Sequence, residues 1–183
     1  ITPCQRCIVC MSGSFVPYVK YATRVGKCTV NPVIGKEHEA FLPPVSEGRK
    51  RVMIAGGGPG GMQAAITAAD RGHDVLLCEK SGTLGGTIQF SDKVWFKKPL
   101  KKFMDVLIRR VQERAIRVLL NTPVTPELAG EYAPDTLIIA VGAEPIVPNI
   151  PGIDLPHVVR ALDLYNEGVT VGRRVVFIGG GLV

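Results

Sequence analysis

The sequence predicts an α/β protein in which a parallel sheet lies between layers of helices. Three observations lead to this prediction: short apolar runs end in glycine, amphipathic helical patterns separate these runs, and the 183 residues include 21 glycines. Strands that alternate with helices are typical of a parallel sheet covered on both faces. The length suits one medium domain with a small appendage.

The first strand–helix–strand unit is expected in residues 52–78. Val52–Ala55 is apolar throughout and bounded by glycine, which is typical of a buried parallel strand. Gly60–Arg71 follows as a helix, because its apolar residues share one face and Gly72 provides a stop. Val75–Cys78 is then the second strand of the unit.

The rest of the chain continues this alternation less regularly. Four prolines within residues 143–156 predict a connector. We expect a short helix at Phe15–Ala22, a turn at Ser81–Gly86 and a long amphipathic helix at Trp95–Ile116. Three further strands are expected, at Val118–Leu120, Thr136–Val141 and Arg174–Ile178.

A glycine pattern, Gly56-x-Gly58-x-x-Gly61, joins the first strand to the first helix. The first glycine permits the tight turn, the second lets the backbone approach a pyrophosphate, and the third lets helix and strand pack closely. The pyrophosphate would lie on free N–H groups at the positive end of the helix. Glu79, which ends the second strand, can accept hydrogen bonds from ribose hydroxyls and would repel a 2′-phosphate. The spacing therefore predicts a Rossmann-like dinucleotide site.

Cysteines form a second candidate site. Cys4, Cys7 and Cys10 follow one another at three-residue steps, and Cys28 comes later, whereas Cys78 lies in an apolar strand as a core residue. This spacing suits one shared metal better than two disulfides, and both zinc and a 4Fe–4S cluster accept four cysteines. The run of three favours iron–sulfur, because structural zinc ligands tend to come in two pairs. Reduced cysteines indicate a cytoplasmic setting.

Composition argues against several classes of protein. The formal net charge is +6, and many basic residues fall in the helical stretch of residues 93–117. A solvated helix face, or one that meets an acidic domain, explains them, and without interleaved aromatics we expect no nucleic-acid partner. No apolar run approaches the roughly 20 residues that span a bilayer, and no signal peptide is visible, so no membrane association is expected. No residue is assigned to catalysis.

Together these motifs resemble the C-terminal part of the old-yellow-enzyme-like NADH:flavin oxidoreductases and NADH oxidases. Bacterial 2,4-dienoyl-CoA reductase and trimethylamine dehydrogenase belong to that family. The resemblance rests on the three-cysteine run and on Cys28-Thr-Val-Asn31-Pro32, Val52–Gly61, Ala69-Asp-Arg-Gly72-His73, Leu84-Gly-Gly86 and Ala140-Val-Gly142-Ala-Glu-Pro145.

The resemblance implies a set of cofactors and of residues that hold them. FAD would be held by Gly56, Gly58, Gly61, Glu79 and Gly86, and a 4Fe–4S cluster by Cys4, Cys7, Cys10 and Cys28. Further candidate cofactor-binding positions are Pro59, Gly60, Lys80, Gly85, Thr87, Val124, Ala140 and Gly142.

The resemblance also implies that the chain is a fragment of a longer one. A TIM barrel with FMN would precede it, and a second glycine pattern from Gly179 would begin an NAD(P)H domain. Electrons would pass from NAD(P)H through FAD and the cluster to FMN, which would reduce an unsaturated substrate. The isolated chain is not expected to turn over substrate.

Four parts of the chain follow from this interpretation. Residues 1–48 would form the iron–sulfur-type segment and residues 49–145 the FAD-binding domain, with a connector at 146–173 and the truncated start of the NAD(P)H-binding domain at 174–183. The alternative is a non-catalytic module that binds ADP or FAD and carries a structural zinc site.

Overall fold

The computed structural model describes residues 4, 5, 7, 9–12, 28–35, 37, 48–93, 95–165 and 169–179. The chain divides into two compact units, residues 1–143 and 144–183. The helix expected at Phe15–Ala22 lies outside the described residues. The four-part division of the chain stays a prediction.

One sheet of four parallel strands organises the first unit, with the strand order β3-β2-β1-β4. The strands β1, β2, β3 and β4 are Arg51–Ala55, Asp74–Cys78, Ile116–Leu119 and Thr136–Ile139. β1 pairs with β2 from Arg51 opposite Asp74 to Ala55 opposite Cys78, and on its other side with β4. The predicted α/β fold with a parallel sheet is therefore confirmed.

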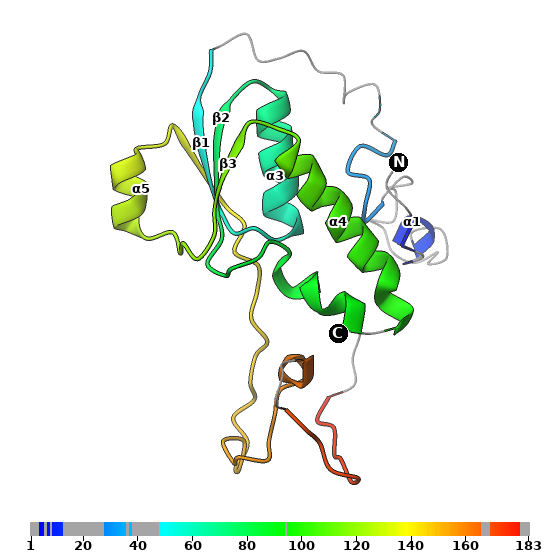
Figure 1. The fold of residues 1–183 in the computed structure, drawn as a ribbon. Helices are drawn as coiled ribbons and strands as arrows, with labels where there is room; N and C mark the ends of the chain where they lie inside the picture. Colours follow the sequence, from blue (N-terminus) through cyan, green and yellow to red (C-terminus); the bar gives the residue numbers. More distant parts are fainter. Residues whose placement is uncertain are drawn as a thin grey trace, which may run out of the picture. The chain divides into compact units, whose positions relative to one another are not determined.

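Helices cover both faces of this sheet. The helices α3, α4 and α5 are Pro59–Asp70, Lys98–Gln112 and Pro126–Tyr132. Figure 1 shows α3 and α4 on one face and α5 on the other. Successive strand side chains point to opposite faces, so Val52 and Ile54 join the core under α3 and α4, whereas Met53 packs toward α5 with Leu76 and Cys78.

The helix expected at Trp95–Ile116 is shorter than predicted. Residues Trp95–Lys97 form a separate 3₁₀ turn, η2, and α4 begins at Lys98 with Pro99 in its first turn. Proline is tolerated there because first-turn N–H groups have no partner within the helix. The helix ends at Gln112 because the chain turns at residues 113–115 to enter β3.

Other elements also differ from the sequence prediction. α5 was not predicted, and neither was η1, a 3₁₀ helix at Gly86–Lys93. The short helices α1 and η3, at Val9–Ser12 and Ala161–Tyr165, were not predicted either. The strand expected at Arg174–Ile178 is wrong: these residues form no strand, and Val176 and Phe177 are exposed. A parallel strand needs a hydrogen-bonded neighbour, and the described residues of the second unit contain no other strand.

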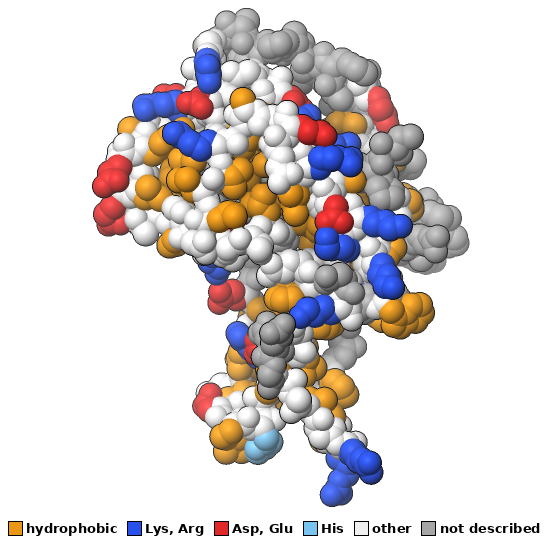
Figure 2. All heavy atoms as spheres, in the orientation of Figure 1, with side chains coloured by type: hydrophobic (Ala, Val, Ile, Leu, Met, Phe, Trp, Pro, Cys, Tyr) orange, Lys and Arg blue, Asp and Glu red, His pale blue; other side chains and the backbone are white. Residues whose placement is uncertain are grey.

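An exposed aromatic pair lies in η2, and many positive charges lie along α4. Trp95 is 80% exposed, and its ring meets that of Phe96 edge-on with 5.6 Å between centroids. Lysine and arginine side chains spread along the flank of α4 (Figure 2). Lys101 pairs with Asp105, and Arg109 with Glu113, both on the exposed side. This arrangement matches a solvated helix face.

Candidate dinucleotide-binding site

The candidate site is the turn between β1 and α3. Gly56, the first residue after β1, has φ +107°, a conformation that L side chains rarely adopt. A Cβ at this position would also lie 2.4 Å from the Ala140 carbonyl oxygen. Ala140 approaches so closely because its N–H donates to the Ala55 carbonyl at 2.8 Å, which extends the pairing of β1 and β4. Both constraints require glycine at position 56.

The third glycine of the pattern lets α3 pack against the turn. A Cβ on Gly61 would lie 1.8 Å from the Gly56 carbonyl oxygen, so no side chain fits there. Gly58, in contrast, has open space: a Cβ built on it comes no closer than 4.0 Å to any neighbour, the Gly86 Cα. The second glycine thus leaves room for a ligand, whereas the first and third serve the fold.

Three backbone N–H groups in this turn are left for a ligand. The Gly56 N–H donates to the Cys78 carbonyl at 2.8 Å, and Pro59 has no N–H. The first hydrogen bond of α3 runs from Met62 N–H to the Gly58 carbonyl. The N–H groups of Gly58, Gly60 and Gly61 therefore have no partner within the first turn of the helix. Such a group of amides at a helix N-terminus attracts an anion.

Glu79 lies against the same turn, at the end of β2. It is only 7% exposed, and its Oε2 accepts a hydrogen bond of 2.6 Å from the Gly57 N–H. The Gly57 amide is therefore not available to a phosphate. Oε1 accepts from both the N–H and the hydroxyl of Ser81, each at 2.8 Å. Hydrogen bonds therefore join the Glu79 carboxylate both to the glycine turn and to Ser81 in the loop after β2.

The Glu79 carboxyl is held in its ionised form. Burial opposes ionisation, but hydrogen bonds from the Ser81 and Gly57 N–H groups and from the Ser81 hydroxyl, together with the charge of Lys80, outweigh it and lower the pKa of Glu79 below its usual value. An ionised carboxylate only accepts hydrogen bonds. The site therefore offers amide donors for an anion on one side and an acceptor for hydroxyls on the other.

Two adjacent glycines in the loop after β2, Gly85 and Gly86, lie against the turn. The Gly85 N–H donates to the Gly57 carbonyl at 2.9 Å. Gly85 and Gly86 both have positive φ, +134° and +56°, and a Cβ on Gly86 would lie 3.2 Å from the Gly58 Cα. The sequence-predicted Leu84-Gly-Gly86 segment thus lies beside the second glycine of the turn.

The remaining predicted cofactor positions are less closely joined to the turn. Lys80 and Thr87 are exposed, and Gly142 has φ +76° with open space around its Cα. Val124 packs with the α5-side cluster of Met53, Leu76 and Cys78. A role for these four positions in binding stays a prediction.

Sequence reasoning missed Ser81. It bonds to Glu79 through both its N–H and its hydroxyl. A serine two residues after an acid, in a turn, is the available signal, because such hydroxyls often bond to nearby groups of their own turn.

Residues 28–30 join the cysteine segment to the core of the first unit. Val30 is buried in the core cluster that includes Phe103 and Leu107, and Cys28 packs against the same cluster. Cys7 Sγ lies 2.9 Å from the Thr29 hydroxyl. This hydrogen bond, with a smaller contribution from the Val9 N–H, lowers the pKa of the Cys7 thiol. The run of cysteines and the loop with the fourth cysteine are thus neighbours.

None of the five cysteines forms a disulfide. Among the described residues, no three side chains of His, Cys, Asp or Glu gather closely enough to hold a metal ion. The ligand set Cys4, Cys7, Cys10 and Cys28 therefore stays a prediction, which the donor chemistry fits and which the Cys7–Thr29 contact supports.

An open hollow of about 570 Å³ lies elsewhere on the unit, between α3 and β4. Its walls include Val52, Thr67, His73 and Ile138. It contains none of the glycines of the turn, and the chemistry described above belongs to the turn rather than to this hollow.

In the described part of the chain, no helix is both long and apolar enough to cross a membrane.

The parallel sheet, the glycine turn and the buried carboxylate define a dinucleotide-binding α/β domain. Residues 50–183 match the family model described as pyridine nucleotide-disulphide oxidoreductase. The chain therefore belongs to this family of oxidoreductases.

Curated relatives agree with this assignment. The chain is 38% identical to an NADH oxidase of Thermoanaerobacter brockii, over 98% of the chain and 28% of the relative. It is 35% identical to a bilirubin reductase of Mediterraneibacter gnavus, again over 98% of the chain and 28% of the relative. The resemblance to NADH oxidases stated from the motifs is thus confirmed, and the chain spans little more than a quarter of these relatives.

Solved structures give the same result. A 2-naphthoyl-CoA reductase, in a complex with 2-naphthoyl-CoA, matches with a TM-score of 0.73 and 33% identity, over 79% of this chain and 22% of the other. An amine oxidase of Pseudomonas geniculata N1 that acts on 6-hydroxypseudooxynicotine matches with a TM-score of 0.67 and 27% identity, over 76% and 23% of the two chains.

Proposed function

We propose that this chain is the FAD-binding electron-transfer part of an NAD(P)H-dependent flavin and iron–sulfur oxidoreductase. The observation that carries the proposal is the pairing of three free amides at the start of α3 with the buried Glu79 carboxylate. One set of groups suits a diphosphate and the other suits a ribose, as an adenine dinucleotide requires.

The residues of the turn would each have a distinct role. The N–H groups of Gly58, Gly60 and Gly61 would donate to the diphosphate, supported by the dipole of the 12-residue helix α3. Gly58 leaves the space that the diphosphate needs, since the nearest atom to a Cβ built there is the Gly86 Cα at 4.0 Å. Glu79 would accept the ribose hydroxyls. Bound FAD would supply the redox chemistry, for which the protein provides position and field.

The cysteines would hold a 4Fe–4S cluster. Thiolates at short spacing suit such a cluster, and the contact between Cys7 and Thr29 brings the first cysteine run next to the loop of Cys28. The alternative function, a nucleotide module with structural zinc, uses the same thiols. Iron and zinc analysis of protein purified without oxygen distinguishes the two.

The missing partners would be other domains of a longer polypeptide, an FMN-containing TIM barrel and an NAD(P)H domain. Relatives that are three to four times longer support this, and so do their names, which include a cinnamate reductase of Clostridium sporogenes that is 37% identical over 98% of this chain. In such a polypeptide this part would pass electrons from the nicotinamide toward the domain that reduces the substrate.

Titration with FAD tests the proposal. We expect stoichiometric binding that quenches flavin fluorescence and that ADP competes for. Gly58→Val should abolish binding, because the side chain would fill the space left for the diphosphate. Gly130→Ala is a matched control, since Gly130 lies in α5 with no atom within 4 Å of an added Cβ. Equal FAD affinity of Gly58→Val and the wild type would overturn the proposal.

A further inference from the structure

Ser81 makes more hydrogen bonds to Glu79 than any other described residue, and the sequence motif assigns it no role. Its N–H and its hydroxyl both donate to Oε1 at 2.8 Å, while Gly57 N–H donates to Oε2. We propose that Ser81 is a positioning residue whose hydroxyl holds the Glu79 carboxylate in the orientation that accepts a ribose hydroxyl. This inference rests on the proposed function.

Counting acceptor sites shows how the carboxylate is prepared. A carboxylate offers about four lone-pair positions, and Ser81 and Gly57 fill three of them. Two of the three bonds come from backbone N–H groups, which cannot move without moving the turn. The third, from the Ser81 hydroxyl, completes the set of donors that fixes the carboxylate, and one acceptor position, on Oε2, remains for a ligand.

The Ser81 hydroxyl has a second acceptor within reach. Its Oγ lies 2.8 Å from Glu79 Oε1 and 2.9 Å from the Thr83 carbonyl oxygen. A hydroxyl has one proton and can donate to only one of them at a time. The ionised carboxylate is the stronger acceptor of the two, so the hydroxyl donates to Glu79 Oε1. Oε1 then carries both Ser81 donors, and the acceptor position left for a ligand is on Oε2, which receives only the Gly57 N–H.

The acceptor position left on Oε2 favours a ligand that brings a hydrogen-bond donor. A 2′- or 3′-hydroxyl of a ribose can donate to it. A 2′-phosphate has no such proton at neutral pH, and its charge would lie beside a carboxylate that is 7% exposed. Lys80 is the neighbouring positive charge that acts on Glu79, and it is exposed to solvent. Ser81 thus contributes to the choice of a free ribose.

The test compares two hydroxyl deletions in the same turn. Ser81→Ala removes the hydroxyl that faces Glu79, whereas Thr83→Ala removes one that bonds to Gln89 at 2.9 Å. Calorimetric titration of the 183-residue chain measures the affinity for ADP, 2′-deoxy-ADP and 2′-phospho-ADP. We expect Ser81→Ala to reduce the preference for ADP over the other two by about tenfold, the effect of losing one charge-assisted hydrogen bond. Thr83→Ala should keep the wild-type preference.

Further variants separate positioning from folding. Ser81→Thr retains a hydroxyl and should restore the preference, and Ser81→Cys, which replaces Oγ by a weak donor of similar shape, should lose it as Ser81→Ala does. ADP binding should also fail at a higher pH in Ser81→Ala than in the wild type as the solution is acidified, because Glu79 loses a donor that favours its ionised form.

The outcomes are distinguishable. If the wild type binds ADP and Ser81→Ala matches Thr83→Ala in both preference and pH profile, the role of Ser81 is refuted while the proposed function stands. If the wild type binds neither ADP nor FAD, both proposals are overturned.

Discussion

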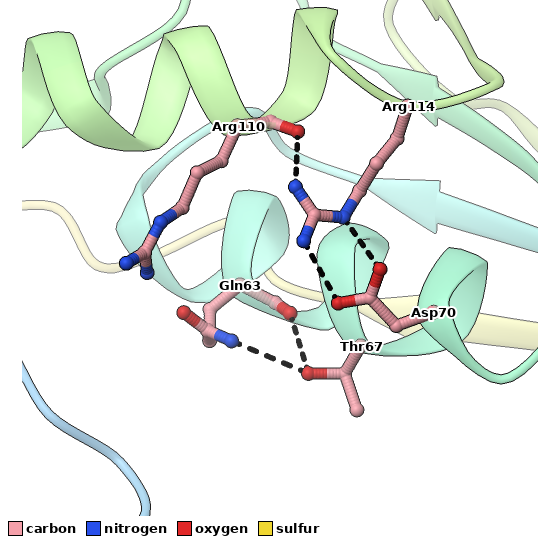
Figure 3. Close-up of polar contacts among 5 residues, drawn as sticks. All are labelled: Gln63, Thr67, Asp70, Arg110 and Arg114. Carbon is pink, nitrogen blue, oxygen red and sulfur yellow. Dashed lines mark hydrogen bonds and ion pairs between the residues drawn. The ribbon is translucent and has the colours of Figure 1, made fainter.

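Arg114 binds Asp70 through two parallel hydrogen bonds and thereby ties the end of α4 to the end of α3. Its Nε and one terminal nitrogen donate to the two carboxylate oxygens at 2.6 and 2.9 Å, and the other terminal nitrogen donates to the Arg110 carbonyl at 2.8 Å (Figure 3). Asp70 raises the pKa of Arg114. The pair fixes the two helices that cover one face of the sheet.

Loss of this pair should weaken the fold by a measurable amount. We expect Arg114→Ala to lower the free energy of unfolding by about 1 kcal/mol, because a bidentate, partly buried pair exceeds an ordinary surface pair. Urea denaturation measures the change. Arg109→Ala, which removes an exposed pair with Glu113, should cost no more than about 0.5 kcal/mol. Equal effects of the two variants would contradict this prediction.

Gly61 and Gly60 should respond in opposite ways to alanine. A Cβ on Gly61 would meet the Gly56 carbonyl oxygen at 1.8 Å, whereas nothing lies within 4 Å of one on Gly60. Gly61→Ala should destabilise the protein by at least about 3 kcal/mol or prevent folding. Gly60→Ala should leave it as stable or raise its stability by up to about 1 kcal/mol, since alanine favours a helix. Thermal unfolding followed by circular dichroism distinguishes them.

Glu79 should make stability depend on acid. Because its pKa is lower in the folded chain than in the unfolded chain, the unfolded chain binds the proton more readily, and the ionised group stabilises the fold above the unfolded pKa of about 4.3. That stabilisation is lost as the pH falls toward and through the folded pKa. Urea unfolding between about pH 3 and 7 should show a shallower decline for Glu79→Gln than for the wild type; identical slopes would refute this.

The buried thiol of Cys78 should resist alkylation. It is 1% exposed, and burial raises its pKa although Arg117 opposes the shift. The thiolate is the reactive form, so iodoacetamide at pH 8 should label the exposed Cys4 and Cys10 well before Cys78. Mass spectrometry of peptides reports each site. Denaturant should remove the difference, and rapid labelling of native Cys78 would contradict the burial.

The turn and its two strands could be predicted from sequence because local constraints determine them. β1, α3 and β2 lie within one residue of their predicted bounds, since an apolar strand, a glycine turn and an amphipathic helix each leave a periodic pattern. α5 was predictable but missed: Thr125 accepts from the Leu128 N–H at 3.3 Å, ahead of Pro126 and Glu127, which together form a recognisable helix start.

Other features depend on contacts that the pattern does not encode. Arg174–Ile178 has the apolar composition of a strand but no partner strand within the described part of its unit. Apolar composition alone therefore led to a wrong prediction of a strand. The close contact between Gly56 and Ala140 also needed coordinates, because the sequence does not show that the carbonyl of a residue so far along the chain lies against this turn. The bond from Gly57 to Glu79, which withdraws one amide from phosphate binding, left no trace in the sequence.

The exposed Trp95 side chain in η2 is an intrinsic fluorescent probe. Trp95 is the single tryptophan of the sequence and is 80% exposed, so fluorescence excited at the indole arises from one known place. Its emission should be red-shifted and readily quenched by acrylamide. A molecule that binds over η2 and buries this ring would shift the emission to shorter wavelength, so binding could be followed without an added label.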